Sequence, residues 1–208
     1  MKIDRHKDAL IIVDLQNDFC PGGALAVPGG DEIVPIINQL IPNFNKIYNT
    51  QDWHPPDHIS FNAQGGPWLP HCVQDTKGAE LHPGLKAEMA ENIKKGTDAD
   101  HETYSGFQGT HLAENLRTNG IKRVIVCGLA TDYFVKAAVI DAITEGFNVV
   151  VLSDAVRGFE VKPGDSDAAV KAMRKAGAIV ATSEELLSRA KAGIMLQNQG
   201  QTFYHIIL

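Results

Sequence analysis

Short β-branched apolar runs alternate along the chain with longer stretches in which apolar residues recur every three or four positions. The apolar runs predict strands at 9–13, 46–50, 124–127, 148–152 and 178–180. The amphipathic stretches predict helices at 31–45, 109–119, 131–145, 163–175 and 183–191. Continuous apolar strands that alternate with helices indicate a parallel sheet covered on both faces. We therefore expect an α/β fold of three layers, αβα, with a central, mostly parallel sheet.

Composition narrows the kinds of protein that fit this pattern. The chain has 208 residues, 44% of them hydrophobic, which fits a single domain over 1–208 with a C-terminal tail, 191–208, of unassigned role. A net charge of −6 without a basic run argues against nucleic acid or an anionic membrane as partner. No apolar run approaches the ~20 residues of a membrane span, and no secretory signal is visible.

The cysteine count favours a reducing compartment. Three widely spaced cysteines make an odd number, which does not suit a disulfide framework. We therefore expect a cytoplasmic protein, and its assembly into a homo-oligomer is left open.

Residues 51–83 interrupt the alternation with a long loop that holds both tryptophans and four of the eight histidines. Loops of this length inside a compact domain are usually functional or disordered, and the aromatic content argues against disorder. Asp52 and His54 are two positions apart, so they point the same way from an extended segment. The two prolines that follow bend the chain and bring His58 back, and His71 lies further along. One carboxylate and three imidazoles suit zinc, with iron or manganese as alternatives, whereas solvated loop histidines are the competing interpretation.

Other polar positions follow predicted strands. Asp14 stands at the carboxyl end of the first strand, where active sites of parallel sheets lie, and is a candidate general base. Asp18 is read as a loop cap. Lys95, which precedes a glycine turn, would by itself be read as a surface lysine. The backbone N–H groups of 128–134, where a strand leads into a helix, could hold an oxyanion, although any such junction has this geometry.

Six motifs in a fixed order make the signal specific. They are Ile12–Phe19 (IVDLQNDF), Thr50–His58 (TQDWHPPDH), Trp68–Gln74 (WLPHCVQ), Lys95–Thr97 (KGT), Tyr104–Phe107 (YSGF) and Val126–Tyr133 (VCGLATDY). Together they resemble the nicotinamidases of the isochorismatase-like hydrolase superfamily, with agreement from about residue 8 to 190. The resemblance implies the isochorismatase-like hydrolase fold. It also implies hydrolysis of nicotinamide to nicotinate and ammonia in NAD salvage, by an Asp/Lys/Cys triad with a bound divalent metal.

The resemblance also implies roles for single residues. In the triad, Asp14 would be the acid/base and Lys95 its cationic partner. The metal, which in the family orients the pyridine nitrogen, would be held by Asp52, His54, His58 and His71. The aromatic wall of the pocket would be formed by Phe19, Trp68 and Tyr104. The oxyanion hole would use the backbone amides of Ala130 and residue 134, beside a cis peptide at Leu129–Ala130.

The chain departs from the family at the nucleophile, because Phe134 stands where the family has its cysteine. Cys127 would lie in the core and Cys72 behind the metal, whereas the direction of the Cys20 side chain is open. A substitution, a natural change and a modified cysteine written under another letter would each account for Phe134. We favour a nicotinamidase framework with a recent or artificial change.

Two alternatives to that framework remain. The first is a catalytically inactive relative that keeps the metal and binds a small ligand or a protein partner. The second is an isochorismatase or carbamoyl amidohydrolase, which is less favoured because those relatives are expected to lack the metal ligands.

Overall fold

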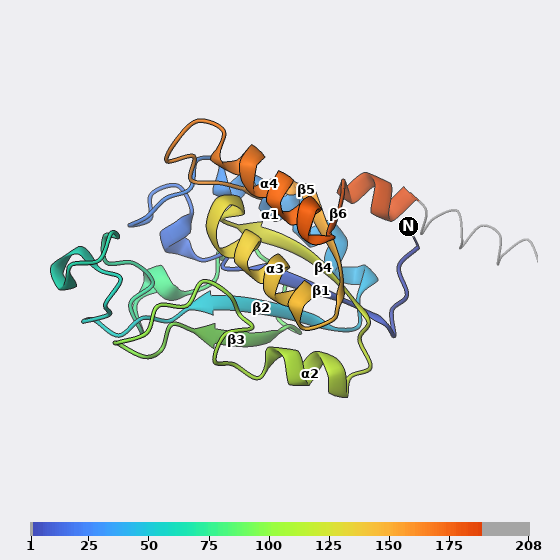
Figure 1. Cartoon of the computed structure of the whole chain (residues 1–208), viewed down its shortest axis with the longest axis horizontal. Helices are drawn as coiled ribbons and strands as arrows, with labels where there is room; N and C mark the ends of the chain where they lie inside the picture. The colour runs from blue at the N-terminus through green and yellow to red at the C-terminus, as the bar shows by residue number, and fades with distance from the viewer. Residues whose placement is uncertain (1, 189–208) are drawn as a thin grey trace, which may run out of the picture.

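A six-stranded, entirely parallel sheet forms the centre of the protein in this computed structural model, which describes residues 2–188 (Figure 1). The strands are β1 (Asp8–Val13), β2 (Ile47–Asp52), β3 (Glu91–Lys95), β4 (Arg123–Leu129), β5 (Asn148–Arg157) and β6 (Ile179–Ala181). Their order in the sheet is β3-β2-β1-β4-β5-β6. The sheet confirms the α/β class and the parallel arrangement. The predicted tail at 191–208 lies outside the described residues.

Helices cover both faces of the sheet. They are α1 (Val34–Leu40), α2 (Leu112–Thr118), α3 (Lys136–Thr144) and α4 (Asp165–Ala176). The connections from β1 to β2 and from β2 to β3 run one way across the sheet, and those from β3 to β4 and onward run the other way. Because such crossovers are right-handed, α1 lies on one face and α2, α3 and α4 on the opposite face, as Figure 1 shows. The three-layer prediction is confirmed.

One strand, β3, was not predicted. Only Ile93 and Lys95 of its five residues are buried, so the segment lacks the apolar run that identifies the other strands. It lies at the edge of the sheet and pairs only with β2. Edge strands commonly carry charged residues, which explains why the pattern reads as a polar loop.

The predicted helix at 31–45 was too long. The structure has a 3-10 turn at Gly30–Ile33, then α1, then a second 3-10 turn at Ile41–Asn43. Pro42 lies in this second turn, and a proline has no N–H with which to continue an α-helix. The predicted helix at 131–145 also begins differently, with a π-helical turn at Thr131–Val135 before α3.

The core is densest along the two central strands. All six residues of β1 are buried, and each pairs with a residue of β4. Gly128 of β4 lies opposite Val13, and a β-carbon there would lie 2.1 Å from the Val13 carbonyl oxygen. This close approach sets the spacing of the two strands at the end of the sheet where the polar residues gather. No helix among the described residues is long and apolar enough to cross a membrane.

We expect Gly128→Ala to lower the free energy of unfolding by roughly 3–5 kcal/mol, because overpacking adds to the strain of a side chain at positive φ. Gly146→Ala is the matched control, since Gly146 also has a positive φ but nothing lies within 4 Å of its β-carbon position. That control should lose only about 1–2 kcal/mol. Urea unfolding measures both, and equal losses would contradict the close approach at Gly128.

Candidate active site and metal centre

The candidate site lies where four parallel strands end. Asp14 directly follows β1, Asp52 and Lys95 are the last residues of β2 and β3, and β4 leads into Ala130. Asp52 and Lys95 are also partners in the β2–β3 register. The direction of the connections reverses between β1 and β4, and doubly wound sheets bind ligands at such a point.

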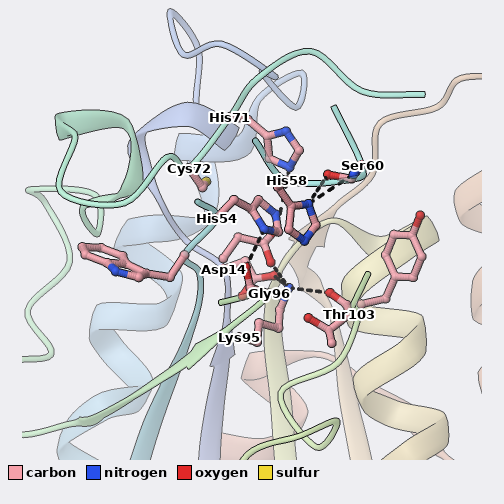
Figure 2. A network of polar contacts seen from close by, with 12 residues as sticks. Asp14, His54, His58, Ser60, His71, Cys72, Lys95, Gly96 and Thr103 are labelled. Atoms are coloured by element: carbon pink, nitrogen blue, oxygen red, sulfur yellow. Dashed lines mark hydrogen bonds and ion pairs between the residues drawn. The ribbon is translucent and has the colours of Figure 1, made fainter. Parts of the chain in front are cut away.

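A buried lysine joins two carboxylates at the floor of the site (Figure 2). The Nζ atom of Lys95 lies 2.9 Å from Oδ2 of Asp14 and also donates to Oδ1 of Asp52. The hydroxyl of Thr50 donates to the other oxygen of Asp14 at 2.6 Å. Asp14 and Lys95 are about 80 residues apart in the sequence, and their proximity agrees with the expectation from the motifs. Their catalytic roles remain predictions.

The three charged groups differ in how readily they exchange a proton. Burial raises the pKa of Asp14 to about 6, although Lys95 opposes the shift. Burial acts in the same direction on Asp52, but Lys95 and the neighbouring imidazoles outweigh it and hold the pKa of this carboxyl well below its usual range. Burial disfavours the charge on Lys95, yet the two carboxylates raise the pKa of its ammonium above the ordinary value. Asp14 is therefore the member of the cluster suited to proton transfer near neutral pH.

The second oxygen of Asp52 faces two imidazoles. Its Oδ2 atom lies 3.4 Å from Nε2 of His54 and 3.8 Å from Nε2 of His71, and it has no hydrogen-bond partner. The Nδ1 atoms of the two imidazoles lie 2.9 Å from the carbonyl oxygen of Gly96 and 2.7 Å from that of Leu69. Donation from Nδ1–H to a carbonyl leaves the Nε2 lone pair free, which is the usual arrangement of histidines that bind a metal.

These three groups fit a divalent cation. A buried carboxylate oxygen without a partner is unfavourable by itself, and a cation placed among it and two imidazole lone pairs would satisfy all three. Asp52, His54 and His71 form a group whose ligand atoms all lie within 4.8 Å of one another. The donor set of two nitrogens and one oxygen suits zinc, iron or manganese.

His58 lies apart from this convergence. Its ring stacks on His54 at 3.9 Å between centroids, with Nδ1 2.7 Å from the Ser60 hydroxyl and Nε2 3.2 Å from the carbonyl oxygen of His101. It belongs instead to a second possible ligand group with His54 and Glu102. Glu102, whose pKa burial raises, was not predicted, because no motif signals it.

Aromatic rings close the site above the lysine. The Phe134 ring is only 3% exposed, and its centroid lies 4.4 Å from Nζ of Lys95. It packs against Phe19 at 5.2 Å and stacks on Tyr104 at 5.8 Å. Trp68 lies further out. Phe134 thus lies against the ammonium and against two of the predicted wall residues, Phe19 and Tyr104, while Trp68 reaches this cluster through Tyr133.

Two aromatic residues beside the predicted wall, Tyr133 and Phe159, were not predicted. Both pack against Trp68, at 5.1 and 6.0 Å between ring centroids. The carboxylate of Asp132 accepts the backbone N–H of Phe159 and so ties its segment to the turn after β4. The position of Phe159 just after β5 was the only available signal, because strand ends in such sheets face the site.

Comparison with known proteins gives the same assignment. Residues 8–185 match the isochorismatase domain family. The chain belongs to the isochorismatase family. A nicotinamidase from Escherichia coli is 42% identical to it, over 84% of this chain and 94% of the relative. This confirms the family and the fold that the motifs imply.

Solved structures agree with this assignment. A pyrazinamidase from Pyrococcus horikoshii, solved in complex with zinc, is 50% identical and superposes with a TM-score of 0.80, over 85% of this chain and 99% of the other. PnC1 from L. infantum, solved in complex with nicotinate, is 37% identical with a TM-score of 0.85, over 89% and 98% of the two chains.

The oxyanion region of this isochorismatase-family chain has the expected backbone. The Leu129–Ala130 peptide is cis, as the resemblance implies. The carbonyl of Ala130 accepts the N–H groups of Tyr133 and Val135 at the start of the π-helical turn. The backbone of residue 134 lies in that same turn, so both amides predicted for the oxyanion hole lie at the end of β4.

None of the three cysteines offers a substitute nucleophile. All are buried, and burial raises the pKa of each thiol, to about 11 for Cys20 and well above the ordinary value for Cys72 and Cys127. The Sγ atom of Cys127 contacts the carbonyl oxygen of Ile11 inside the sheet. Thiolate chemistry needs an accessible thiol with a lowered pKa, and these three have the opposite character.

We expect Lys95→Met in the metal-free protein to reduce the free energy of unfolding by roughly 3–5 kcal/mol, because it leaves two buried carboxyls without their cation. The loss should be larger at pH 8 than at pH 5. In the variant both buried carboxyls have raised pKa values. Keeping them ionised in the folded protein therefore costs more free energy as the pH rises.

Lys94→Met is the matched control for this experiment. Lys94 is exposed and its ammonium lies over the Trp53 ring, on the other side of the same edge strand. The control should lose less than about 1 kcal/mol at either pH. Chemical unfolding measures both variants, and an equal effect of the two substitutions would contradict the role of Lys95.

Proposed function

We propose that this site binds nicotinamide and is arranged to hydrolyse its amide to nicotinate and ammonia, and that Phe134 stops the reaction at the covalent step. The observation that carries the proposal is the position of Lys95, whose ammonium joins the acid/base candidate Asp14 to the metal-ligand candidate Asp52. Support also comes from the nicotinamidase and pyrazinamidase relatives. Proton transfer and metal binding would therefore act on the same small substrate.

The residues of the chain divide the chemistry among them. With a thiol at position 134, Asp14 would take the thiol proton while the sulfur attacked the amide carbon. The nitrogen would then leave as ammonia with that proton, and water would cleave the thioester to nicotinate. Lys95 holds Asp14 in place and keeps positive charge beside the reacting group. The backbone amides of Ala130 and residue 134 would stabilise the developing oxyanion.

The metal, for which we propose zinc, would be held by Asp52, His54 and His71. His58 is the least direct of the four ligand candidates, since both of its ring nitrogens have other partners. Three protein ligands leave positions open, and a bound metal would supply one of them to a pyridine nitrogen. Phe19, Trp68 and Tyr104 would then hold the ring of the substrate.

A second candidate function is binding without turnover. The observation that favours it is the Phe134 ring, which packs on Phe19 and Tyr104 and lies over Lys95. Such a protein would keep a small heteroaromatic ligand unchanged. The cytoplasmic location, the single domain with a tail and the homo-oligomer remain predictions.

We expect the parent chain to hydrolyse nicotinamide at a negligible rate and Phe134→Cys to restore turnover. Loss of the nucleophile from comparable triads lowers kcat on the order of 10⁶-fold, since the members act as a unit. Release of ammonia by the metal-loaded proteins measures the effect, and an intact mass verifies the residue at 134.

Phe134→Ala separates two effects of the phenylalanine, the bulk of its ring and its lack of a nucleophilic atom. It removes the bulk of the ring but adds no nucleophile, so we expect it to bind nicotinamide, as the parent does, and to show no turnover. Ordinary nicotinamidase rates in the verified parent chain would refute the proposal. A folded, metal-loaded Phe134→Cys variant that stays inactive would favour the binding protein.

We expect about one divalent ion per chain after reconstitution. His71→Ala should abolish binding, and His58→Ala should weaken it less. Because neutral imidazole is the binding form, occupancy should fall as the pH drops below ~6.5. Elemental analysis across a pH series measures this, and protein without stoichiometric metal at pH 8 would rule out the site.

A further inference from the structure

We infer that Asp18 is a positioning residue for the metal centre, acting through the backbone of Cys72. This inference rests on the metal site proposed above. Asp18 is not a ligand candidate, and its sequence context suggests only a cap for its own loop. Its carboxylate nevertheless reaches 54 residues along the chain, where Oδ2 accepts the backbone N–H of Cys72 at 2.7 Å.

The peptide that Asp18 holds lies between two proposed ligands. Cys72 directly follows His71, and its carbonyl accepts the backbone N–H of His54 at 3.0 Å. His54 also forms an isolated parallel bridge with Val73. One hydrogen bond, accepted by Asp18, therefore fixes a short backbone segment that carries His71 and is hydrogen-bonded to the backbone of His54. Figure 2 shows Cys72 beside His54 and His71.

The backbone at Cys72 needs such support. Its φ is +46°, in the left-handed region that a residue with a β-carbon rarely adopts. Conformations of this kind persist only where the surroundings enforce them. The side chain of Cys72 is fully buried, so the strain is not relieved by turning the residue toward solvent. The carboxylate of Asp18 is the polar group that holds the N–H of this residue.

The loop opposite Asp18 is shaped to admit its carboxylate. A β-carbon at Gly78 would lie 2.1 Å from Oδ2 of Asp18, so only glycine leaves the carboxylate in place. The other oxygen of Asp18 accepts the N–H of Ala24 at 3.1 Å, which sets the orientation of the carboxylate from its own loop. The carboxylate is thus held on one side and sterically enclosed on the other.

Asn17 provides a control that the chain itself offers. Its side-chain amide donates to the carbonyl of Lys77 at 2.7 Å, so it joins the same two loops as Asp18. It makes no hydrogen bond with the backbone of residues 71–73. Loss of Asn17 therefore weakens the attachment of the loops without releasing Cys72.

The test is a titration of the metal-free chain with Co²⁺, followed by visible absorption. We expect Asp18→Ala and Gly78→Ala to bind Co²⁺ about 10–100-fold more weakly than the parent and with an altered spectrum, as is typical when groups that orient metal ligands are lost. Asp18→Asn keeps the shape and one acceptor oxygen, so its loss should be smaller. Asn17→Ala should lower the melting temperature but leave the Co²⁺ affinity and spectrum as in the parent.

The outcomes separate this inference from the proposed function. Parental affinity and spectrum in Gly78→Ala and in folded Asp18 variants would overturn the role of Asp18 and leave the metal site standing. The same affinity loss in Asn17→Ala would also overturn it, because general loosening of the loops would then explain the effect. A parent chain that binds no Co²⁺ would overturn the metal site and the inference together.

Discussion

An ammonium group without access to water joins the carboxylates at the ends of β1 and β2, and the rest of the site is arranged around it. Lys95 has two anionic partners, so the buried group carries more negative than positive charge as long as Asp14 is ionised. Burial favours protonation of Asp14, and the unpartnered oxygen of Asp52 faces two imidazoles. Proton exchange and affinity for a cation thus follow from the same charge imbalance.

The sequence predicted the parts of the fold that depend on local patterns. Five strands were recognised by their apolar runs, and four of them are largely buried on both faces of the sheet, while the edge strand β6 is only partly buried. The edge strand β3 was missed because only Ile93 and Lys95 face inward. Lys95 lies in this polar segment, so its local sequence suggests a surface lysine. Its side chain lies beside Asp14 because β3 pairs with β2, which the local sequence does not show.

Motif order identified most of the candidate site, but the contacts between distant loops could not be read from it. Asp18 and Cys72 are 54 positions apart, and nothing near either residue signals that a carboxylate meets a strained peptide. Phe159 reaches the aromatic wall because Asp132 holds its backbone. Such contacts depend on how loops cross in three dimensions, whereas spacing along the chain reports only on neighbours within an element.

The placement of Lys95 on an edge strand links the stability of that strand to the chemistry of the site. A strand with one neighbour opens more easily than a central strand, and local opening of β3 would draw the ammonium away from both carboxylates. Conversely, the two buried ion pairs hold that strand against the sheet. Selection that preserves the chemistry of the site would then also preserve the edge strand β3. Substitutions at the polar, exposed positions of β3 would be tolerated only as long as the strand stays paired with β2.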